Sequence, residues 1–297
     1  MTAADEHAER FTLLRPLLFT IAYESLGSAT EADDVLQDSY LRWAGVELAQ
    51  VRDTKAYLAQ LVTRQALNTL RAQARRREDY VGPWLPEPLL LDDHDGAADV
   101  VLAESVSMAM LVVLESLSPD ERAVFVLREV FGFSHDEIAS AIGKSTAAVR
   151  QMAHRAREHV HARRRRFEPV DAQRSEQITT QFLMAAATGD LEGLMAMLAP
   201  DVVFTSDSDG KVSAARRPVF GAQKVARLLI GLMSRAGAEY RMEVATYNSS
   251  PAMIVYRDER PDSVFTIEVI DGKITNFYAI RNPEKLASAT VPREISR

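Results

Sequence analysis

The spacing of hydrophobic residues divides the chain into a helical part and a mixed part. From residue 8 to residue 77, and again from 100 to 166, apolar side chains recur three and four positions apart, which predicts helices. Breaks are expected near Gly27, Gly45 and Gly132, and Ser118-Pro119 is expected to start a helix that runs to residue 131. The first half of the chain is therefore predicted to be all-helical.

Both helices and strands are expected beyond residue 174. The pattern predicts helices at 175–188, 190–198 and 221–235, and strands at 202–206, 240–248, 252–258, 263–270 and 273–280. The last two strands meet at Asp271-Gly272, a signal for a tight hairpin. This order predicts an α+β domain with an antiparallel sheet.

Two segments lack periodicity and are interpreted as linkers. Residues 79–99 combine glycine, three prolines and a run of aspartates, and residues 167–174 form a shorter joint. The predicted organisation is therefore a helical domain over 1–78, a linker over 79–104, a second helical domain over 105–166, a short linker over 167–174 and the mixed domain over 175–297.

Composition limits the compartment and the chemistry. A chain of 297 residues with 47% hydrophobic and 26% charged residues is typical of a globular protein of two or three domains. It has no cysteine, which excludes disulfides, thiolate nucleophiles and cysteine-ligated metals and fits a reducing compartment. No secretory signal is visible, and the apolar run Met108–Leu114 is too short to cross a bilayer, so we expect a cytoplasmic protein without membrane contact.

The distribution of charge points to nucleic acid although the net charge is −7. Residues 64–77 hold five arginines and no acid, and residues 144–166 are basic apart from Glu158. Residues 78–99 hold only acids among their charged side chains. Local basic stripes decide whether a phosphate backbone can bind, so both stripes are candidate contacts.

The segment from Ser134 to Arg150 predicts a helix-turn-helix. Ser134 and Glu137 form a capping box, and Ile138 and Ile142 lie one turn apart, as core residues do. Gly143 stands where the turn needs a left-handed residue, and Ser145 can cap the second helix. The second helix of this motif enters the major groove of DNA.

Basic and polar residues are expected on the outer face of that second helix. Arg150 lies near its N-terminus, where it could contact a base edge, whereas Arg155 and Arg157 suit phosphates. The alternative is a plain helical hairpin with a solvated basic face. The candidate DNA-binding residues are Ser145, Thr146, Arg150, Gln151, His154, Arg155 and Arg157.

The N-terminal helices carry a more specific resemblance. EADDVLQDSYLRW (31–43) has acids on one face, and AYLAQLVTRQALNTLR (56–71) follows it as a long helix with a basic end. These segments resemble regions 2.2 to 2.4 of bacterial sigma factors of the extracytoplasmic-function group. Residues 113–160, including the run from Arg155 to Glu158, resemble region 4 of the same group, and the two parts stand in the right order.

The resemblance implies binding surfaces in both helical domains. An acidic face would dock on the basic β′ clamp helices of core RNA polymerase, although an ordinary solvated helix would look similar. The residues implied are Glu31, Asp33, Asp34, Gln37 and Asp38. Region 4 would bind the −35 promoter element and the β flap.

The helix over 54–77 would hold the melted −10 element of the promoter. The residues implied are Lys55, Arg64, Gln65, Asn68, Arg71 and Arg75. Relatives usually carry Asn where this chain has Gln65 and Asp where it has Asn68, so the base preference can differ. Trp43 and Tyr57 are interpreted as core aromatics.

The C-terminal domain extends the resemblance to a subgroup. Members of the sigma group ordinarily end near residue 165, whereas this chain adds about 130 residues whose order fits a nuclear transport factor 2-like or SnoaL-like cone. Sigma factors with such an extension share a linker motif, a glycine-rich turn and a terminal patch. The matching segments are Trp84-Leu85-Pro86-Glu87-Pro88, Asp207-Ser208-Asp209-Gly210-Lys211 and Asn282-Pro283-Glu284-Lys285-Leu286.

In that subgroup the extension acts in place of a separate anti-sigma factor. We expect the linker motif and the Asp207–Lys211 turn to meet at an autoregulatory interface that includes Asn282, Pro283, Lys285 and Leu286. The alternatives are a solvated linker and a simple C-terminal tether. A monomer is expected for the free protein.

Two other functions remain open from the sequence. One is a stand-alone helix-turn-helix regulator with a ligand-sensing domain, which would bind duplex DNA without polymerase. The other is a SnoaL-like enzyme, which needs a buried base and an oxyanion donor. No histidine follows residue 161 and no catalytic pair is fixed by the spacing, so we predict no catalytic residue, cofactor or metal.

Overall fold

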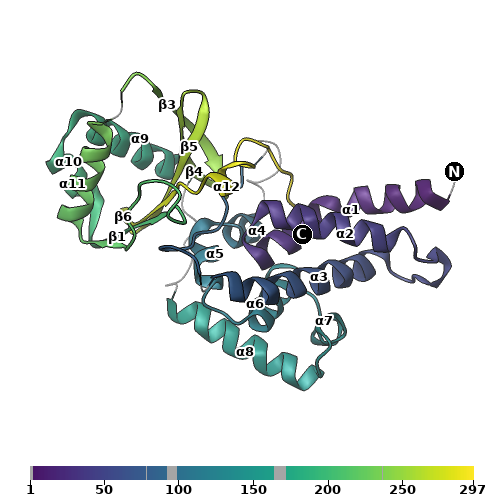
Figure 1. The fold of residues 1–297 in the computed structure, drawn as a ribbon. Coiled ribbons are helices and arrows are strands. Elements are labelled where there is room, and N and C mark those ends of the chain that lie inside the picture. Colours follow the sequence, from purple (N-terminus) through teal and green to yellow (C-terminus); the bar gives the residue numbers. More distant parts are fainter. Residues whose placement is uncertain (1–2, 78, 92–98, 164–171, 236) are drawn as a thin grey trace.

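The computed structural model describes residues 3–77, 79–91, 99–163, 172–235 and 237–297. It contains a three-helix bundle, a second helical body and an α+β body, with the linker between them (Figure 1). None of the described helices is long and apolar enough to cross a membrane.

The first body consists of three helices around an apolar core. Leu18, Ile21, Leu36 and Leu58 are buried where the helices meet. Trp43 is also fully buried, as predicted, but Tyr57 beside it is 37% exposed and only partly belongs to the core. The elements are α1 (Ala3–Leu26), α2 (Ala29–Trp43), a 3-10 turn (Leu48–Gln50) and α3 (Thr54–Arg77).

The second body contains the predicted helix-turn-helix and packs on α3. Its elements are α4 (Val100–Ser105), α5 (Met108–Leu114), α6 (Pro119–Phe125), a π-helix (Val126–Val130), α7 (His135–Ile142) and α8 (Thr146–Arg163). The helix predicted over 119–131 is present, but its second part, Val126–Val130, is a π-helix, which was not predicted. Val126, Leu127 and Val130 of the π turn are buried.

The third body is a six-stranded sheet with three helices. Its helices are α9 (Ala172–Thr188), α10 (Leu191–Met197) and α11 (Ala222–Met233). Its strands are β1 (Leu198–Asp207), β2 (Val219–Phe220), β3 (Tyr240–Tyr247), β4 (Ser250–Arg257), β5 (Arg260–Ile270) and β6 (Lys273–Ile280), and a short helix α12 (Pro283–Leu286) follows. The strand order is β2-β1-β6-β5-β4-β3, and only β1 and β6 are parallel neighbours. This is the predicted nuclear transport factor 2-like cone.

The two faces of the sheet bury different partners. One face packs Phe204, Phe277 and Ile274 against the helices α9 and α11. The opposite face packs Ile254, Val264 and other residues against the linker and α5. The sheet therefore separates the interior of the cone from the helical bodies, as strand alternation requires.

Hairpin geometry was only partly visible in the sequence. Asp271-Gly272 forms the predicted turn, with both residues at positive φ. Asn248-Ser249 and Asp258-Glu259 adopt the same left-handed pair without a glycine. The predicted strand over 202–206 is the end of a longer strand β1, and β2 was not predicted.

The linker is ordered by the bodies around it. Residues 79–91 run between the cone and the helical bodies, and Leu90 and Leu91 form isolated β-bridges with Tyr247 and Arg293. Residues 92–98, which include three of the linker aspartates, lie outside the described residues.

Candidate functional site

The helix-turn-helix has the local geometry that its sequence predicts. Ser134 and Glu137 form the capping box at the start of α7. Gly143 ends that helix at φ +68°, a conformation that disfavours any side chain with a Cβ. Ser145 accepts a hydrogen bond from the Ala148 amide at 3.2 Å, and Val149 and Met152 are buried. Local polar groups therefore fix how α8 leaves the turn.

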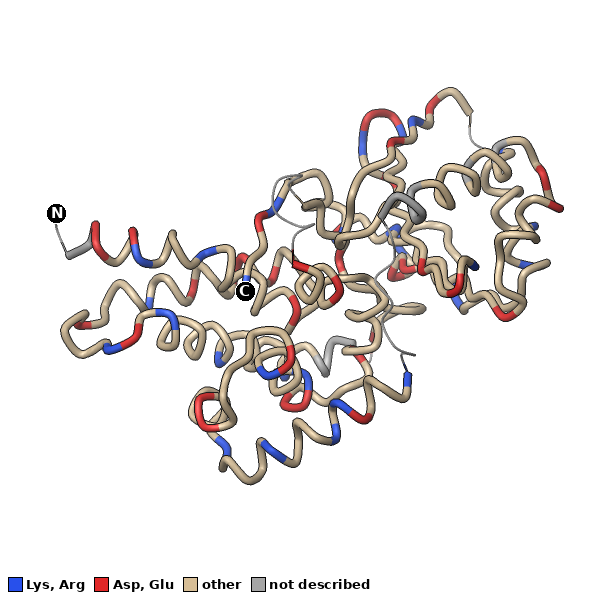
Figure 2. Tube along the Cα trace, turned by 180° about the vertical axis from the view of Figure 1, so that it is seen from behind, with Lys and Arg blue, Asp and Glu red and all other residues tan. Residues whose placement is uncertain are grey.

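The outer face of α8 presents the predicted basic residues. Lys and Arg positions are spaced along this helix (Figure 2), and Arg150, Gln151 and His154 are exposed. Arg155 and Arg157 pair with Glu121 at 3.2 Å and Glu129 at 2.6 Å. The first of these side chains is 55% exposed and the second 48%, so both pairs are solvent-screened and contribute little.

Two of the candidate −10 residues on α3 contact the second helical body. Arg64 donates to the Ser140 and Ala141 carbonyls at 2.8 and 3.0 Å, and these carbonyls end α7. Arg71 pairs with Asp120 at 2.5 Å. A cation at a helix C-terminus is favourable because the unpaired carbonyls and the helix dipole are negative there.

The remaining residues predicted on α3 differ in exposure. Lys55 and Asn68 are exposed, whereas Gln65 is 8% exposed and its amide lies beside Arg42. The side chain of Arg75 lies outside the described part of the structure. In this arrangement Gln65 does not face solvent.

The acidic residues of α2 lie near the end of the chain. Asp34, Gln37 and Asp38 are exposed and Glu31 is half-buried. Asp33 pairs with Arg15 at 3.0 Å and with Arg293 at 2.6 Å. Arg293 belongs to the C-terminal segment, which also places Ile295 in the core of the helical bodies.

A buried ion pair joins the cone to the linker. The side chains of Asp207 and Lys285 are 0% and 8% exposed, and Lys285 Nζ lies 2.6 Å from Asp207 Oδ2. Leu85 completes the site, because its amide donates to Asp207 at 2.7 Å and its carbonyl accepts from Lys285 at 2.5 Å. Lys285 Nζ also lies 3.9 Å from the centre of the Trp84 ring, a cation–π contact.

Residues around this pair complete the contact that the three motifs predicted. Tyr80 donates to Asp207 at 2.5 Å and accepts from Asn282 at 2.9 Å. Burial and the Asp207 carboxylate both raise the pKa of the Tyr80 phenol, so it stays a donor. The structure thus brings Trp84, Leu85, Asp207, Lys285 and Asn282 together.

The periphery of the same contact is more exposed. Lys211 pairs with Asp209 at 3.0 Å and Glu284 at 2.7 Å, and Asp209 accepts from the Val81 amide at 3.2 Å. Gly210 lies against Val81. Pro86 and Leu286 are buried, whereas Pro283, the first residue of α12, is exposed.

The motif residue Glu87 connects the linker to the first bundle. It is 7% exposed, and its carboxylate accepts from Ser28 Oγ at 2.7 Å and from the Thr30 amide at 3.0 Å. These donors stand at the N-terminus of α2, where a carboxylate is favoured by the free amides and the helix dipole. The helix with the candidate polymerase residues is thus capped by the linker.

Asn248 was missed by the sequence reasoning, although it contacts three parts of the chain. Its Oδ1 accepts from the Leu89 amide at 3.0 Å, and its Nδ2 donates to Tyr23 Oη at 2.7 Å and to the Val106 carbonyl at 2.9 Å. It is fully buried at φ 52°, in the turn between β3 and β4. The available signal was an Asn-Ser dipeptide between two β-type runs.

A second missed cluster joins the two helical bodies directly. Arg122 of α6 is 1% exposed, donates to the Glu24 carbonyl at 2.8 Å and pairs with Glu115. Ser105 donates to the buried Glu24 carboxyl at 2.6 Å. Burial raises the pKa of Glu24 to about 8, so this carboxyl is mostly neutral at pH 7.

Two segments of the chain match models of known regions. Residues 11–76 match Sigma-70 region 2, and residues 107–160 match Sigma-70, region 4. The fold and the site therefore define a bacterial sigma factor with an added cone domain.

Similarity over nearly the whole chain specifies the group. SigJ of Mycobacterium tuberculosis, an ECF (extracytoplasmic-function) RNA polymerase sigma factor, is 38% identical over 291 residues, which cover 94% of this chain and 93% of SigJ. The crystal structure of SigJ matches with a TM-score of 0.77 at 34% identity, covering 96% of this chain and 99% of SigJ. The probable ECF sigma factor SigI of the same organism is 28% identical over 275 residues, 92% of each chain. The chain belongs to the ECF RNA polymerase sigma factors.

Proposed function

We propose that this sigma factor is held in a closed arrangement by its own cone domain. In the open form α2 binds the β′ clamp helices of bacterial core RNA polymerase, α3 binds the −10 element and α8 binds the −35 element. The cone acts in cis, without a separate anti-sigma factor, on a protein that is monomeric and cytoplasmic when free.

The observation that carries this proposal is that three of the expected contact residues, Arg64, Arg71 and Asp33, have partners on other parts of the chain. Arg64 is held by the carbonyls of α7, and Arg71 by Asp120. Asp33 is held by Arg293 from the C-terminal segment. A residue cannot make these contacts and equivalent contacts to polymerase or promoter at the same time.

The linker explains how a cone distant from α3 could maintain this state. Asp207 and Lys285 fix Leu85, Asn248 fixes Leu89, and Glu87 between them caps α2. Both helical bodies are attached to this one segment. We infer that they can separate to fit polymerase only when contacts of the linker with the cone are released.

Binding to purified bacterial core polymerase tests the proposal. We expect the full-length protein to bind weakly and Asp33→Lys/Asp34→Lys to abolish binding. Arg293→Glu should strengthen binding about fivefold, because the Arg293–Asp33 pair is partly exposed and such pairs contribute up to ~1 kcal/mol. Arg260→Glu, an exposed arginine on β5, is the matched control and should bind as the wild type does.

Two results would count against the proposal. Equal polymerase binding by the wild type and Arg293→Glu would show that the C-terminal segment does not mask α2. Binding of duplex promoter DNA by the full-length protein, with no polymerase binding even for Arg293→Glu, would favour a stand-alone helix-turn-helix regulator.

A further inference from the structure

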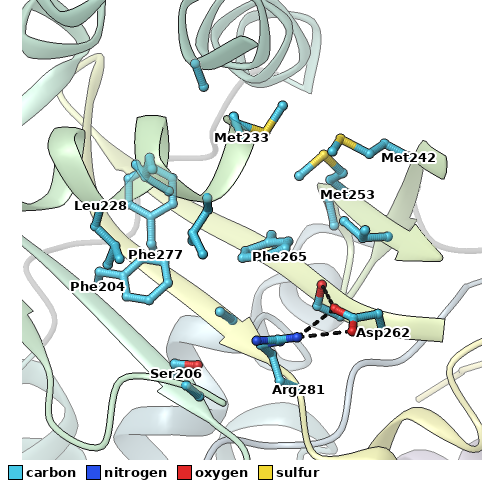
Figure 3. A pocket seen from close by; sticks show the side chains of 18 of the residues that line it. Phe204, Ser206, Leu228, Met233, Met242, Met253, Asp262, Phe265, Phe277 and Arg281 are labelled. Atoms are coloured by element: carbon cyan, nitrogen blue, oxygen red, sulfur yellow. Dashed lines mark hydrogen bonds and ion pairs between the residues drawn. The ribbon is translucent and has the colours of Figure 1, made fainter. Parts of the chain in front are cut away.

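The cone encloses a cavity that the sigma function does not use. Its volume is about 720 Å³, within the range of sites for small organic ligands. It lies between α9, α11 and the face of the sheet that carries Phe204 and Phe277 (Figure 3).

The wall of the cavity is mainly apolar. Phe204, Phe265 and Phe277 line it from β1, β5 and β6, Met242 and Met253 from the strands β3 and β4, and Met233 from α11 (Figure 3). Methionine side chains are flexible and polarisable, so such a wall adapts to different apolar shapes. An elongated or branched hydrocarbon body suits this lining.

The described lining of the cavity includes three arginines and one aspartate. Inside, Arg281 donates to both oxygens of Asp262 at 3.0 and 3.1 Å, so these charges neutralise one another. The lining also includes Arg235 and Arg257, which are exposed and therefore mark an opening to solvent. The described lining residues thus carry an excess of positive charge, located at this opening.

We propose that the cavity binds a lipophilic monocarboxylate of medium chain length. Its hydrocarbon body fills the space among the phenylalanines and methionines, and its carboxylate lies at the opening near Arg235 and Arg257. Among the described lining residues there is no histidine, and the one carboxylate, Asp262, is paired with Arg281.

The cavity and the linker contact lie on opposite faces of the same strands. In β1, Ser206 lines the cavity and the next residue, Asp207, binds Lys285 and Leu85. After β6, Arg281 lines the cavity and Asn282 contacts Tyr80. A shift of either strand on ligand binding is therefore transmitted to the linker within one residue.

The loop between β1 and β2 provides a second connection. Val212, Ser213 and Ala214 form part of the cavity wall, and Arg281 donates to the Ser213 carbonyl. Two residues earlier, Gly210 and Asp209 contact Val81 of the linker. The proposal that a ligand binds depends only on the cavity, whereas the proposal that the ligand affects the linker rests on the function proposed above.

Displacement of a fluorescent probe tests binding. The probe is 11-(dansylamino)undecanoic acid, and the competitors are decanoate and decan-1-ol below their aggregation limits. We expect saturable binding to full-length protein, with decanoate competing up to about fivefold better than decanol, because one exposed ion pair is worth up to ~1 kcal/mol.

Variants separate cavity binding from surface adsorption. Val255→Trp fills the cavity and should abolish probe binding, whereas Val244→Trp on the exposed part of β3 should not. Arg257→Glu, an exposed change that leaves the core intact, should reduce decanoate binding about fivefold and leave decanol unchanged. Absence of probe binding, or equal binding to both tryptophan variants, would overturn the proposal, as would decanol competing as well as decanoate.

Tryptophan emission tests the connection to the linker. Trp84 stacks on Lys285, so decanoate should shift the emission of the wild type and not that of Trp84→Phe. Binding without any such shift would refute the connection while leaving the cavity site intact. Failure of the cis-control proposal would instead appear as polymerase binding that does not respond to Arg293→Glu.

Discussion

Replacement of Lys285 by methionine is the most direct test of the contact between cone and linker. Methionine keeps the length and apolar stem of lysine but removes the ammonium group. That group binds Asp207, the Leu85 carbonyl and the face of Trp84. The change therefore leaves Asp207 buried without its cation.

The expected magnitude follows from burial. Removal of one partner from a buried ion pair costs about 3–5 kcal/mol, because the remaining charge stays desolvated. Asp207 is 0% exposed but still accepts from the Leu85 amide and Tyr80, so the lower end applies. About 3 kcal/mol corresponds to a factor of roughly 150 in the equilibrium between closed and open linker.

Amide hydrogen exchange measures this equilibrium residue by residue. The amides of Leu85, Glu87 and Leu89 donate to Asp207, the Gly27 carbonyl and Asn248. When closing is fast, exchange reports the open population. Lys285→Met should accelerate exchange at the Leu85 amide about a hundredfold.

A matched lysine separates this effect from loss of charge in general. Lys224 on α11 is exposed, and Lys224→Met should leave linker exchange unchanged. Asp207→Asn/Lys285→Met should exchange more slowly than Lys285→Met, because no uncompensated charge is left. An acceleration below threefold for Lys285→Met would refute the argument from burial.

Three further predictions concern the other contacts. Because burial raises the pKa of Glu24 from 4.5 to about 8, its contribution to stability is present below pH 4.5 and lost as pH rises through 8; the Tm of the wild type should fall more between pH 6 and 9 than that of Glu24→Gln. Asn248→Ala leaves the Tyr23 hydroxyl, the Leu89 amide and the Val106 carbonyl without this partner and should cost about 2–4 kcal/mol in denaturant unfolding. Asn248→Asp keeps the acceptor for Leu89 but sets a carboxylate against the Val106 carbonyl in a fully buried site, so it should cost more at neutral pH. Gly27→Ala adds a Cβ at φ +71°, 2.9 Å from the Trp84 ring, and should red-shift tryptophan emission; an unchanged spectrum would argue against close packing there.

The elements that the sequence predicted well are those determined by local signals. The capping box of Ser134 and Glu137, the left-handed Gly143 and the alternating strands depend on neighbours a few residues away. The three motif patches were predicted to meet because of a family resemblance. Nothing in their spacing places Asp207 beside Lys285.

The features that were missed depend on distant parts of the chain. Asn248 contacts Tyr23, 225 residues away, and its amide has no local signature beyond a turn. Arg64 was predicted as a DNA contact from the basic stripe and the family resemblance, and its position at the end of α7 depends on how two helical bodies pack. Hydrogen bonds between bodies are specified by tertiary packing, which periodicity does not encode.

Differences in burial among the contacts imply an order of release. The Arg293–Asp33 pair is 20% and 29% exposed, so water and competing charges reach it, and its loss costs little. The side chains of the Asp207–Lys285 pair are at most 8% exposed. If this pair must open before polymerase binds, each 1.4 kcal/mol of opening free energy lowers the apparent affinity for polymerase tenfold. Under the proposed cis control, basic clamp helices would therefore displace the C-terminal segment first, while the linker is still closed. Separation of the helical bodies then needs a partner that binds the open linker more tightly than the closed one, because equal affinity for both would shift nothing.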